Sequence, residues 1–380
     1  MHFKLTKYYV TLSVLLLGSI SFAFNPDLPL KINGFGTIAT TASDAGDQTI
    51  DTITPNSANY EQFTRLGINF SKRLSLDFSG VFQLIGLGTR DDFNADVDLV
   101  HLIYSPSDQI SLIFGKQKLP SFLVSKYRET GYLTDWVREP WLLYIRNPIR
   151  NFIGASFEYR YDLTPMSNFI MEVYGGANDG KESIGALTIE GSNNDLLGLR
   201  FNYNSKYFTA FVNYLQMQTN ANAFVEVDIP ASALLGPNPA LPDNLRLSLF
   251  DDFSFKLKIY TAGFRYDFKN MAIFAEYYGS DTPDDSISED LDKFSSGYLG
   301  VKYHINEDWK TYLIFMASKA WGSRFILQAI PDSEQYIFGV NYIFSDAVKA
   351  KFAVENQNYY PDGFGKRTYT RYFTSIDFLF

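Results

Sequence analysis

The chain has 380 residues, a formal net charge of −9 and no cysteine. An acidic chain makes nucleic acid an unsuitable partner, and the absence of cysteine excludes a disulfide framework and a lipid-modified cysteine anchor. Aromatic residues make up 17% of the sequence, so the composition also differs from that of an ordinary soluble domain.

The N-terminal segment has the pattern of a secretory signal peptide. Two lysines precede an apolar run over residues 10–20, and Ser21 and Ala23 supply the small residues of a cleavage site. The run is too short for a membrane-spanning helix, which needs about 20 residues. We therefore expect residues 1–23 to be removed, and residues 24–380 to form a single domain whose net charge falls from −9 to −11 with the loss of the two lysines.

After this segment, apolar and polar residues alternate with a period of two. In residues 152–161, for example, Phe157 and Tyr159 share one face, whereas Glu158 and Arg160 share the other. Such alternation is typical of strands that have lipid on one side and water on the other. The pattern predicts sixteen strands, near residues 31–41, 61–70, 74–86, 95–104, 109–117, 152–161, 168–177, 194–204, 206–217, 253–267, 270–280, 294–304, 308–318, 334–344, 348–358 and 369–380.

The connections between these strands alternate between tight turns and long loops. Bacterial outer-membrane barrels show this asymmetry, with short periplasmic turns and long extracellular loops. An even number of strands places both termini in the periplasm, and closure leaves no unpaired backbone edge in lipid. The sequence therefore predicts an all-β fold, a sixteen-stranded antiparallel transmembrane β-barrel.

The predicted strand 253–267 contains an irregularity. Its apolar face is odd-numbered through Ile259 and even-numbered from Tyr260. Either a β-bulge at this point or a misplaced strand explains the change of parity.

The C-terminal strand ends on a bare aromatic residue. Phe380, Phe378 and Ile376 alternate along one predicted face, which we expect to meet lipid. Because a barrel needs its last strand to pair with its first, a chain that stops inside a strand is consistent with closure at this point.

The third of the long connections covers about residues 117–151. It is too long for a hairpin and too rich in Leu, Trp and Tyr to remain in water. A sixteen-stranded barrel has a lumen wide enough for a water channel, so we expect this third loop to fold inward and form a constriction. Trp136, Pro140 and Trp141 are expected to wedge the loop against the wall rather than contact a solute.

Together, the signal peptide, the first strand INGFGTIATTAS, the extended third loop and the terminal Phe380 resemble the trimeric sixteen-stranded porins of Gram-negative bacteria. This resemblance implies an outer-membrane location, a homotrimer, and contact with lipid and lipopolysaccharide. It also implies that the barrel-assembly machinery recognises Phe380 and Phe378, and that loop charges face basic wall residues across the constriction. The loop lacks the acidic PEFGG-like signature of that family, which does not support ordinary cation selectivity.

Basic residues outnumber acidic residues in the third loop, although the chain as a whole is acidic. In a narrow passage with low-dielectric walls, such charges concentrate ions of the opposite sign. The predicted function is passive diffusion of small hydrophilic solutes and ions, with a preference for anions and no cofactor. The candidate constriction residues are Lys116, Lys118, Lys126, Arg128, Glu129, Asp135, Arg138, Glu139, Arg146 and Arg150. The candidate pore-wall residues, assigned by parity, are Arg65, Arg160, Arg200, Lys256, Lys258, Lys349 and Lys351, with Asp77, Glu158 and Glu355 as acidic counterparts.

Alternatives to this interpretation remain open. Each basic residue could lie in water or in an internal salt bridge, for example Arg128 with Asp135 or Arg138 with Glu139. The barrel could also be a substrate-specific channel for phosphate-like or organic anions, or a platform for a surface adhesin or receptor. A saturable block by a solute would indicate the specific channel, and a plugged lumen would indicate the adhesin.

Residues suited to enzyme chemistry are scarce. His101 lies within a predicted strand but has no serine two positions later, unlike the outer-membrane phospholipases, so no enzymatic activity is expected. The acidic stretch 281–292 lacks the ligand spacing and the glycine of a calcium loop and is interpreted as a solvated external tip. The proline-rich stretch 229–244 is expected to form an external loop that does not extend the sheet.

Overall fold

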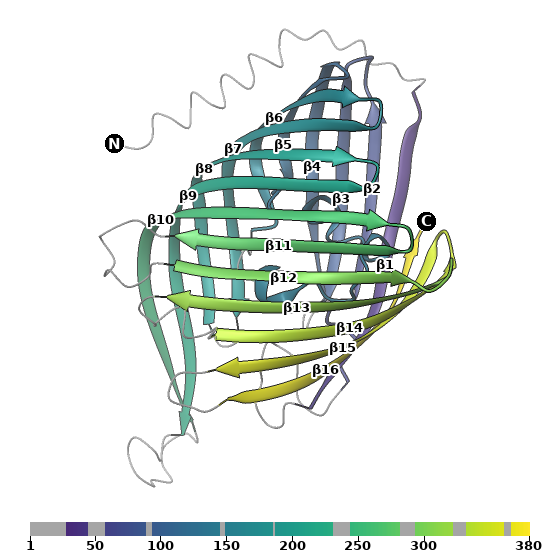
Figure 1. Cartoon of the computed structure of the whole chain (residues 1–380). Helices are drawn as coiled ribbons and strands as arrows, with labels where there is room; N and C mark the ends of the chain where they lie inside the picture. Colours follow the sequence, from purple (N-terminus) through teal and green to yellow (C-terminus); the bar gives the residue numbers. More distant parts are fainter. Residues whose placement is uncertain are drawn as a thin grey trace, which may run out of the picture.

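A computed structural model describes residues 28–44, 58–88, 93–144, 149–184, 187–230, 244–281, 293–321, 332–360 and 366–380. Within these ranges the chain forms a closed antiparallel barrel of sixteen strands (Figure 1). The predicted all-β fold and the predicted number of strands are therefore confirmed. The proposed signal peptide lies outside the described residues.

Each strand pairs with its neighbours in the sequence, and β16 pairs with β1. Turns of two to four residues join successive strands at one end of the barrel, which we call the turn end. The connections at the other end, the loop end, range from two residues between β7 and β8, where the sequence predicts a long loop, to the extended third loop between β5 and β6. The strands are β1 (Leu30–Ser43), β2 (Arg65–Arg73), β3 (Phe78–Gly88), β4 (Phe93–Ser107), β5 (Ile110–Lys118), β6 (Asn151–Thr164), β7 (Ser167–Ile184), β8 (Leu187–Ser205), β9 (Phe208–Pro230), β10 (Asn244–Phe268), β11 (Met271–Asp281), β12 (Lys293–His304), β13 (Trp309–Trp321), β14 (Asp332–Ser345), β15 (Val348–Tyr360) and β16 (Arg367–Leu379).

The barrel closes between β1 and β16. These strands pair over nine positions, from Phe35 opposite Leu379 to Ser43 opposite Arg371. Beyond them, Gly34 exchanges two backbone hydrogen bonds of 2.8 and 3.0 Å with Phe380. The last residue of the chain is therefore part of the ladder that closes the barrel.

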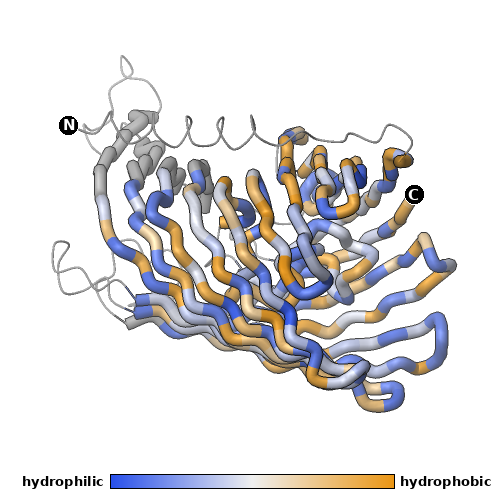
Figure 2. The backbone as a smooth tube through the Cα atoms, turned by 90° about the horizontal axis from the view of Figure 1, so that it is seen from above, coloured by the Kyte–Doolittle hydropathy of each residue, from blue (hydrophilic) through white to orange (hydrophobic). Residues whose placement is uncertain are grey.

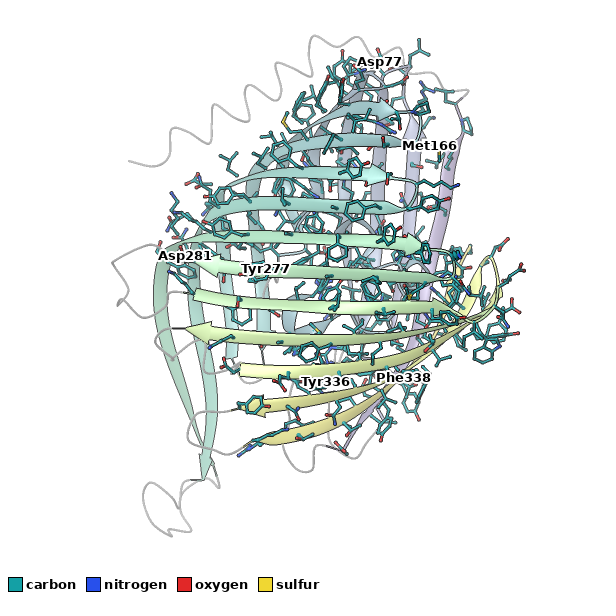
Figure 3. The ribbon with its side chains drawn as sticks, in the orientation of Figure 1. Asp77, Met166, Tyr277, Asp281, Tyr336 and Phe338 are labelled. Carbon is teal, nitrogen blue, oxygen red and sulfur yellow. The ribbon has the colours of Figure 1, made fainter. Side chains whose placement is uncertain are left out.

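The outer face of the wall is apolar, and the polarity alternates along the strands (Figure 2). Tyr277, Tyr336 and Phe338 point away from the barrel (Figure 3) and are 51%, 44% and 49% exposed. An apolar outer face is what a barrel wall in contact with lipid requires. None of the described helices is long and apolar enough to cross a membrane.

Two predictions about individual strands are wrong. The hairpin between β2 and β3 turns at residues 74–77, so Asp77 lies in the turn and not on the wall. Strand β10 keeps an unbroken register with β9 and β11 through Ile259 and Tyr260, so it contains no bulge there. Ile259 is 1% exposed and Tyr260 is 44% exposed, which shows that the odd-numbered side chains face inward.

The same register corrects the position of two predicted pore-wall residues. Lys256 and Lys258 alternate with Leu257 and Ile259, which pack into a hydrophobic cluster inside the barrel. The two lysines therefore lie on the outer face of β10. The alternation of polar and apolar residues gave the wrong face for these lysines because apolar side chains, and not polar ones, line this part of the inner face.

The sheet extends further at the loop end than the sequence predicts. Strands β9 and β10 continue until Pro230 pairs with Asn244, although the stretch 229–244 was expected to stay outside the sheet. Residues 231–243 lie outside the described residues. So does most of the predicted acidic tip, because β11 ends at Asp281 and the description resumes at Lys293.

Candidate functional site: the third loop inside the barrel

The third loop leaves the end of β5 and returns to the wall at β6. It contains two 3-10 turns, η1 (Ser125–Tyr127) and η2 (Gly131–Leu133), and the short helix α2 (Trp141–Tyr144). The helix packs against β12 and β13 and is visible behind these strands inside the barrel (Figure 1). Residues 145–148 of the loop, including Arg146, lie outside the described residues.

Hydrophobic packing holds the loop in the lumen. Leu142 and Leu143 are 0% exposed, and Tyr144 is 1% exposed. They belong to one cluster with inward-facing side chains of the wall, among them Phe274 and Ile314. Burial of a leucine side chain contributes about 2 kcal/mol, so this cluster accounts for much of the stability of the docked loop.

Hydrogen bonds attach the beginning of the loop to β8 and β10. The guanidinium of Arg200 donates to the carbonyl oxygens of Pro120 and Phe122, and the Phe122 bond measures 3.3 Å. The hydroxyl of Thr261 donates to the carbonyl oxygen of Ser121 over 2.6 Å. These backbone carbonyls have no strand partner, so the wall side chains satisfy acceptors that would otherwise be buried without a donor.

A buried carboxylate on β11 holds two other parts of the loop. Glu276, 3% exposed, accepts hydrogen bonds from the backbone N–H of Leu123 and from the hydroxyl of Tyr144, the latter over 3.0 Å. The hydroxyl of Tyr298 on β12 donates to the same carboxylate over 2.7 Å. Glu276 therefore joins the start and the end of the loop to one side of the barrel.

The middle of the loop is attached to the opposite side, where the barrel closes. The ammonium of Lys351 on β15 donates to the carbonyl oxygens of Gly131 and Trp136 over 2.6 and 2.8 Å. It also pairs with Asp377 on β16 over 3.0 Å. Lys349 donates to the carbonyl oxygen of Thr134 over 2.8 Å. Since the first part of the loop is bound to β8, β10 and β11, the loop crosses the lumen from one side to the other.

Ion pairs connect the loop to the adjoining strands. Arg65 on β2 lies 3.2 Å from Glu129, and Arg150 lies 3.5 Å from the same carboxylate. Arg138 lies 3.6 Å from Glu355 on β15. All of these side chains except that of Arg150 are at most 7% exposed, so these pairs are structural contacts of a buried interface.

The charges that the loop presents to water are mainly positive. The side chains of Lys126 and Arg150 are 62% and 40% exposed. Those of the three loop carboxylates, Glu129, Asp135 and Glu139, are 6%, 13% and 16% exposed. The exposed surface of the loop is therefore more basic than its sequence composition alone indicates.

The buried loop carboxylates remain ionised because cations surround them. Burial acts to raise the pKa of Glu129, but Arg150 and Lys118 outweigh this effect and hold that pKa well below its usual range. Burial acts in the same direction on Glu139, yet Arg128 lowers its pKa to about 2. Both groups therefore carry their charge at any pH that the protein meets near neutrality.

The structure changes the pairing expected from the sequence. Arg128 pairs with Glu139, its Nε lying 2.9 Å from Oε1, and not with Asp135. Arg138 pairs with Glu355 and not with Glu139. Asp135 accepts from Lys302 on β12 over 2.8 Å.

The other predicted constriction residues occupy different positions. Lys116 lies opposite the exposed Val100 and pairs with Asp96 over 3.2 Å, so it belongs to the outer face of the wall. Lys118 faces inward and pairs with Asp98 over 2.7 Å. Lys126 approaches Glu158 and Glu172, on β6 and β7, at 3.4 and 3.6 Å.

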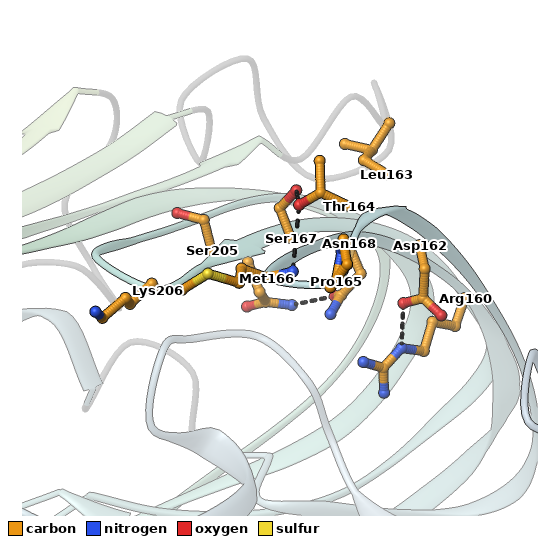
Figure 4. A pocket seen from close by; sticks show the side chains of 11 residues that line it. Arg160, Asp162, Leu163, Thr164, Pro165, Met166, Ser167, Asn168, Ser205 and Lys206 are labelled. Carbon is orange, nitrogen blue, oxygen red and sulfur yellow. Dashed lines mark hydrogen bonds and ion pairs between the residues drawn. The ribbon is translucent and has the colours of Figure 1, made fainter.

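Among the predicted wall residues, Arg160 lies apart from the loop, near the turn end. It lines an open pocket of about 800 Å³ between the β6–β7 and β8–β9 turns and pairs with Asp162 over 2.9 Å (Figure 4). The structure brings Arg65, Arg200, Lys349 and Lys351 to the loop, but not Arg160.

Several residues that hold the loop were missed by sequence reasoning. Thr261, Glu276 and Lys302 bond to the loop directly. Arg371 and Asp377 act through the wall residues Glu355 and Lys351, which contact the loop. All five lie on strands β10 to β16. The alternation within these strands identifies them as inward-facing, which was the available signal. It does not show which inward-facing groups meet the loop, because that depends on how the loop docks.

Nothing in the described part of the chain resembles a metal centre, since no group of three or more His, Cys, Asp or Glu side chains lies close enough to hold an ion. The sequence matches no family model and no curated protein.

Solved structures with the same fold come from bacterial outer membranes. The outer membrane channel DcaP of Acinetobacter baumannii is 13% identical, with 93% of this chain and 97% of that chain covered and a TM-score of 0.60. The anion-selective porin from Comamonas acidovorans is 14% identical, with 93% and 100% covered and a TM-score of 0.58. The trimer form of OmpT, an outer membrane protein of Vibrio cholerae, is 11% identical, with 92% and 99% covered and a TM-score of 0.54. These similarities confirm the predicted resemblance to outer-membrane porins at the level of the fold.

Proposed function

We propose that this protein is a porin of the Gram-negative outer membrane, a passive channel for small hydrophilic solutes and ions with a preference for anions. The closed barrel supplies an apolar outer wall for lipid, and the third loop narrows the lumen. The proposal includes no enzymatic step and no cofactor. The neighbours described as an outer membrane channel and as an anion-selective porin support this class of function.

The preference for anions depends on one observation, the difference in exposure between the loop's cations and its carboxylates. The side chains of Lys126 and Arg150 are 62% and 40% exposed, whereas no loop carboxylate exceeds 16%. Exposed charges in a passage with low-dielectric walls attract counter-ions. Glu158, 26% exposed, reduces this effect near Lys126, so we expect a moderate preference.

The reversal potential of the purified protein in a planar bilayer under a salt gradient tests this proposal. Wild type is expected to favour chloride over potassium, and Lys126→Gln combined with Arg150→Gln should shift the reversal potential toward zero. Lys256→Gln provides a matched control because it removes one lysine from the outer face of β10. Equal shifts in the control and in the double variant, or cation preference in wild type, would contradict the assignment.

A second candidate function is supported by the attachment of the loop to both sides of the barrel. If the loop blocks the lumen, the barrel serves as a platform for an adhesin or receptor. Absence of conductance in bilayers that contain correctly folded protein would favour this function over the porin.

The assembly of the protein follows from the same proposal. We expect a homotrimer, since the OmpT relative forms a trimer, surrounded by lipid and lipopolysaccharide. Residues 1–23 would direct export, and Phe378 and Phe380 would be recognised by the barrel-assembly machinery. The rings of these two residues lie over Gly36 and Gly34 in the closing ladder, so they would become fixed only at the end of assembly.

A further inference from the structure

Three lysines on the inner wall, Lys302, Lys310 and Lys349, lie close to a single carboxylate of the third loop, Asp135. We call the three lysines the lysine cluster. Lys302 donates a hydrogen bond of 2.8 Å to Asp135. Lys310 and Lys349 interact electrostatically with the same carboxylate and with each other. Three lysines therefore surround one loop carboxylate, which Lys302 contacts directly.

Positive charge remains in excess around Asp135. Arg265 on β10 also interacts with it, but this guanidinium is already paired with Asp267 over 2.7 Å. The side chain of Lys310 makes no hydrogen bond or ion pair with any residue in the described ranges. Two wall carboxylates also act on the cluster, Asp377 on Lys349 and Asp267 on Lys302, but each is already paired with another cation, Lys351 or Arg265. A further anion would therefore complement the unpaired ammonium of Lys310.

A buried amide adds hydrogen-bonding capacity beside the cluster. Asn341 on β14 lies between Lys310 on β13 and Lys351 on β15 in the strand register. It is 0% exposed, and neither its Nδ2 nor its Oδ1 has a hydrogen-bond partner among the described residues. A buried amide is costly when it is unsatisfied, so Asn341 is available to bond to a solute placed beside it.

Lys310 is the most exposed member of the cluster and lies near the turn end. Lys310 is half-buried and directly follows the β12–β13 turn at residues 305–308 and Trp309. Lys302 and Lys349 lie deeper, 5% and 6% exposed, beneath the loop. A solute that enters from the turn end would therefore meet Lys310 first and the contact between Lys302 and Asp135 next.

We propose that the lysine cluster is a binding site for a small multivalent oxyanion, and that Asp135 occupies it as a tethered competitor when no such solute is present. The oxyanion would displace the Asp135 carboxylate, accept hydrogen bonds from Lys302 and Lys310, and loosen the middle of the third loop. This inference rests on the proposed channel function and defines a solute class for it.

A binding titration tests the site independently of conductance. Inorganic phosphate at about pH 7.5, where it is largely dianionic, is added to the purified full-length protein in detergent, and tryptophan fluorescence is followed because Trp136 adjoins Asp135. Wild type should show saturable binding that acetate does not reproduce. Asp135→Asn should lower the phosphate Kd at least about fivefold because it removes the competing carboxylate, whose negative charge also repels phosphate.

Further variants make the result decisive. Lys310→Gln should raise the phosphate Kd about fivefold or more through the loss of one nearby charge, and its half-buried position makes it a mild change to the fold. Lys256→Gln on the outer face should leave the Kd unchanged. A Kd for Lys310→Gln equal to that of wild type, or no saturable binding in Asp135→Asn, would overturn the proposal.

Conductance recorded on the same preparations separates this inference from the proposed function. Phosphate should produce a concentration-dependent block of chloride current that Lys310→Gln weakens. Open channels without saturable phosphate binding would refute the binding site but support the porin function. Saturable binding without any conductance would support the binding site but refute the channel function.

Discussion

Replacement of Lys351 by methionine should release the middle of the third loop from the barrel wall. The ammonium of Lys351 is 1% exposed and lies 3.0 Å from Asp377, which is 0% exposed. It also donates to the carbonyl oxygens of Gly131 and Trp136. Methionine keeps most of the volume and removes these three contacts together with a hydrogen bond of 3.3 Å to the hydroxyl of Thr134.

The expected loss is large because the substitution leaves a charge buried without its cation. Removal of one partner of a buried ion pair typically costs about 3–5 kcal/mol. Asp377 retains hydrogen bonds from Thr37 and Ser375, at 2.6 and 3.1 Å, which favours the lower half of that range. A second substitution, Asp377→Asn, removes the stranded charge and should recover about 2 kcal/mol in the double variant.

Urea unfolding in detergent, followed by tryptophan fluorescence, measures these free energies. The matched control is Lys256→Met, which removes a lysine from the outer face and should change the unfolding free energy by less than about 0.5 kcal/mol. A loss below about 1 kcal/mol for Lys351→Met, or additive losses in the double variant, would refute the conclusion that this pair anchors the loop.

Two further predictions concern the loop. Gly131→Ala should destabilise the docked loop by about 1–3 kcal/mol, because a Cβ at this position would lie 2.0 Å from Oδ1 of Asp377. Gly80→Ala is the control and should be neutral in the same urea assay, because its Cβ would meet no atom closer than 3.9 Å. Burial acts to raise the pKa of Glu139, but Arg128 outweighs it and lowers that pKa to about 2 from an ordinary value of 4.5. The stabilisation from this carboxylate should therefore be complete above about pH 4.5 and be lost as the pH falls toward 2. Tm should drop across this pH range in wild type and drop less in Glu139→Gln. An equal drop of Tm in the two proteins would contradict the pairing of Glu139 with Arg128.

The barrel could be predicted from the sequence because its physical cause acts residue by residue. A strand between lipid and water must alternate in polarity, so the pattern in residues 152–161 or 348–358 indicates a wall strand without knowledge of the rest of the chain. The third loop could be located for a similar reason, since its length and its apolar residues exclude a solvated hairpin.

The details of the site could not be predicted because they depend on how the loop docks. In a water-filled lumen, polar side chains are expected on the inner face and apolar ones on the outer face. Leu257 and Ile259 on the inner face of β10 are exceptions, so this expectation placed Lys256 on the wrong face. The partner of Lys351 is another example, because Gly131 lies 220 positions away in the sequence. Only the assembled barrel brings these two residues together.

The position of the loop's anchors also sets an order of events during folding. The hydrogen bond between Thr37 and Asp377 joins residues 340 positions apart, and it lies beside Gly131 where the loop docks. Contacts of such high sequence separation form late, because a long chain segment must first lose its freedom. The loop therefore cannot complete its docking until β16 has joined the barrel. Its apolar residues must remain undocked while the sheet is still open. Docking of the loop would then report that the barrel has closed.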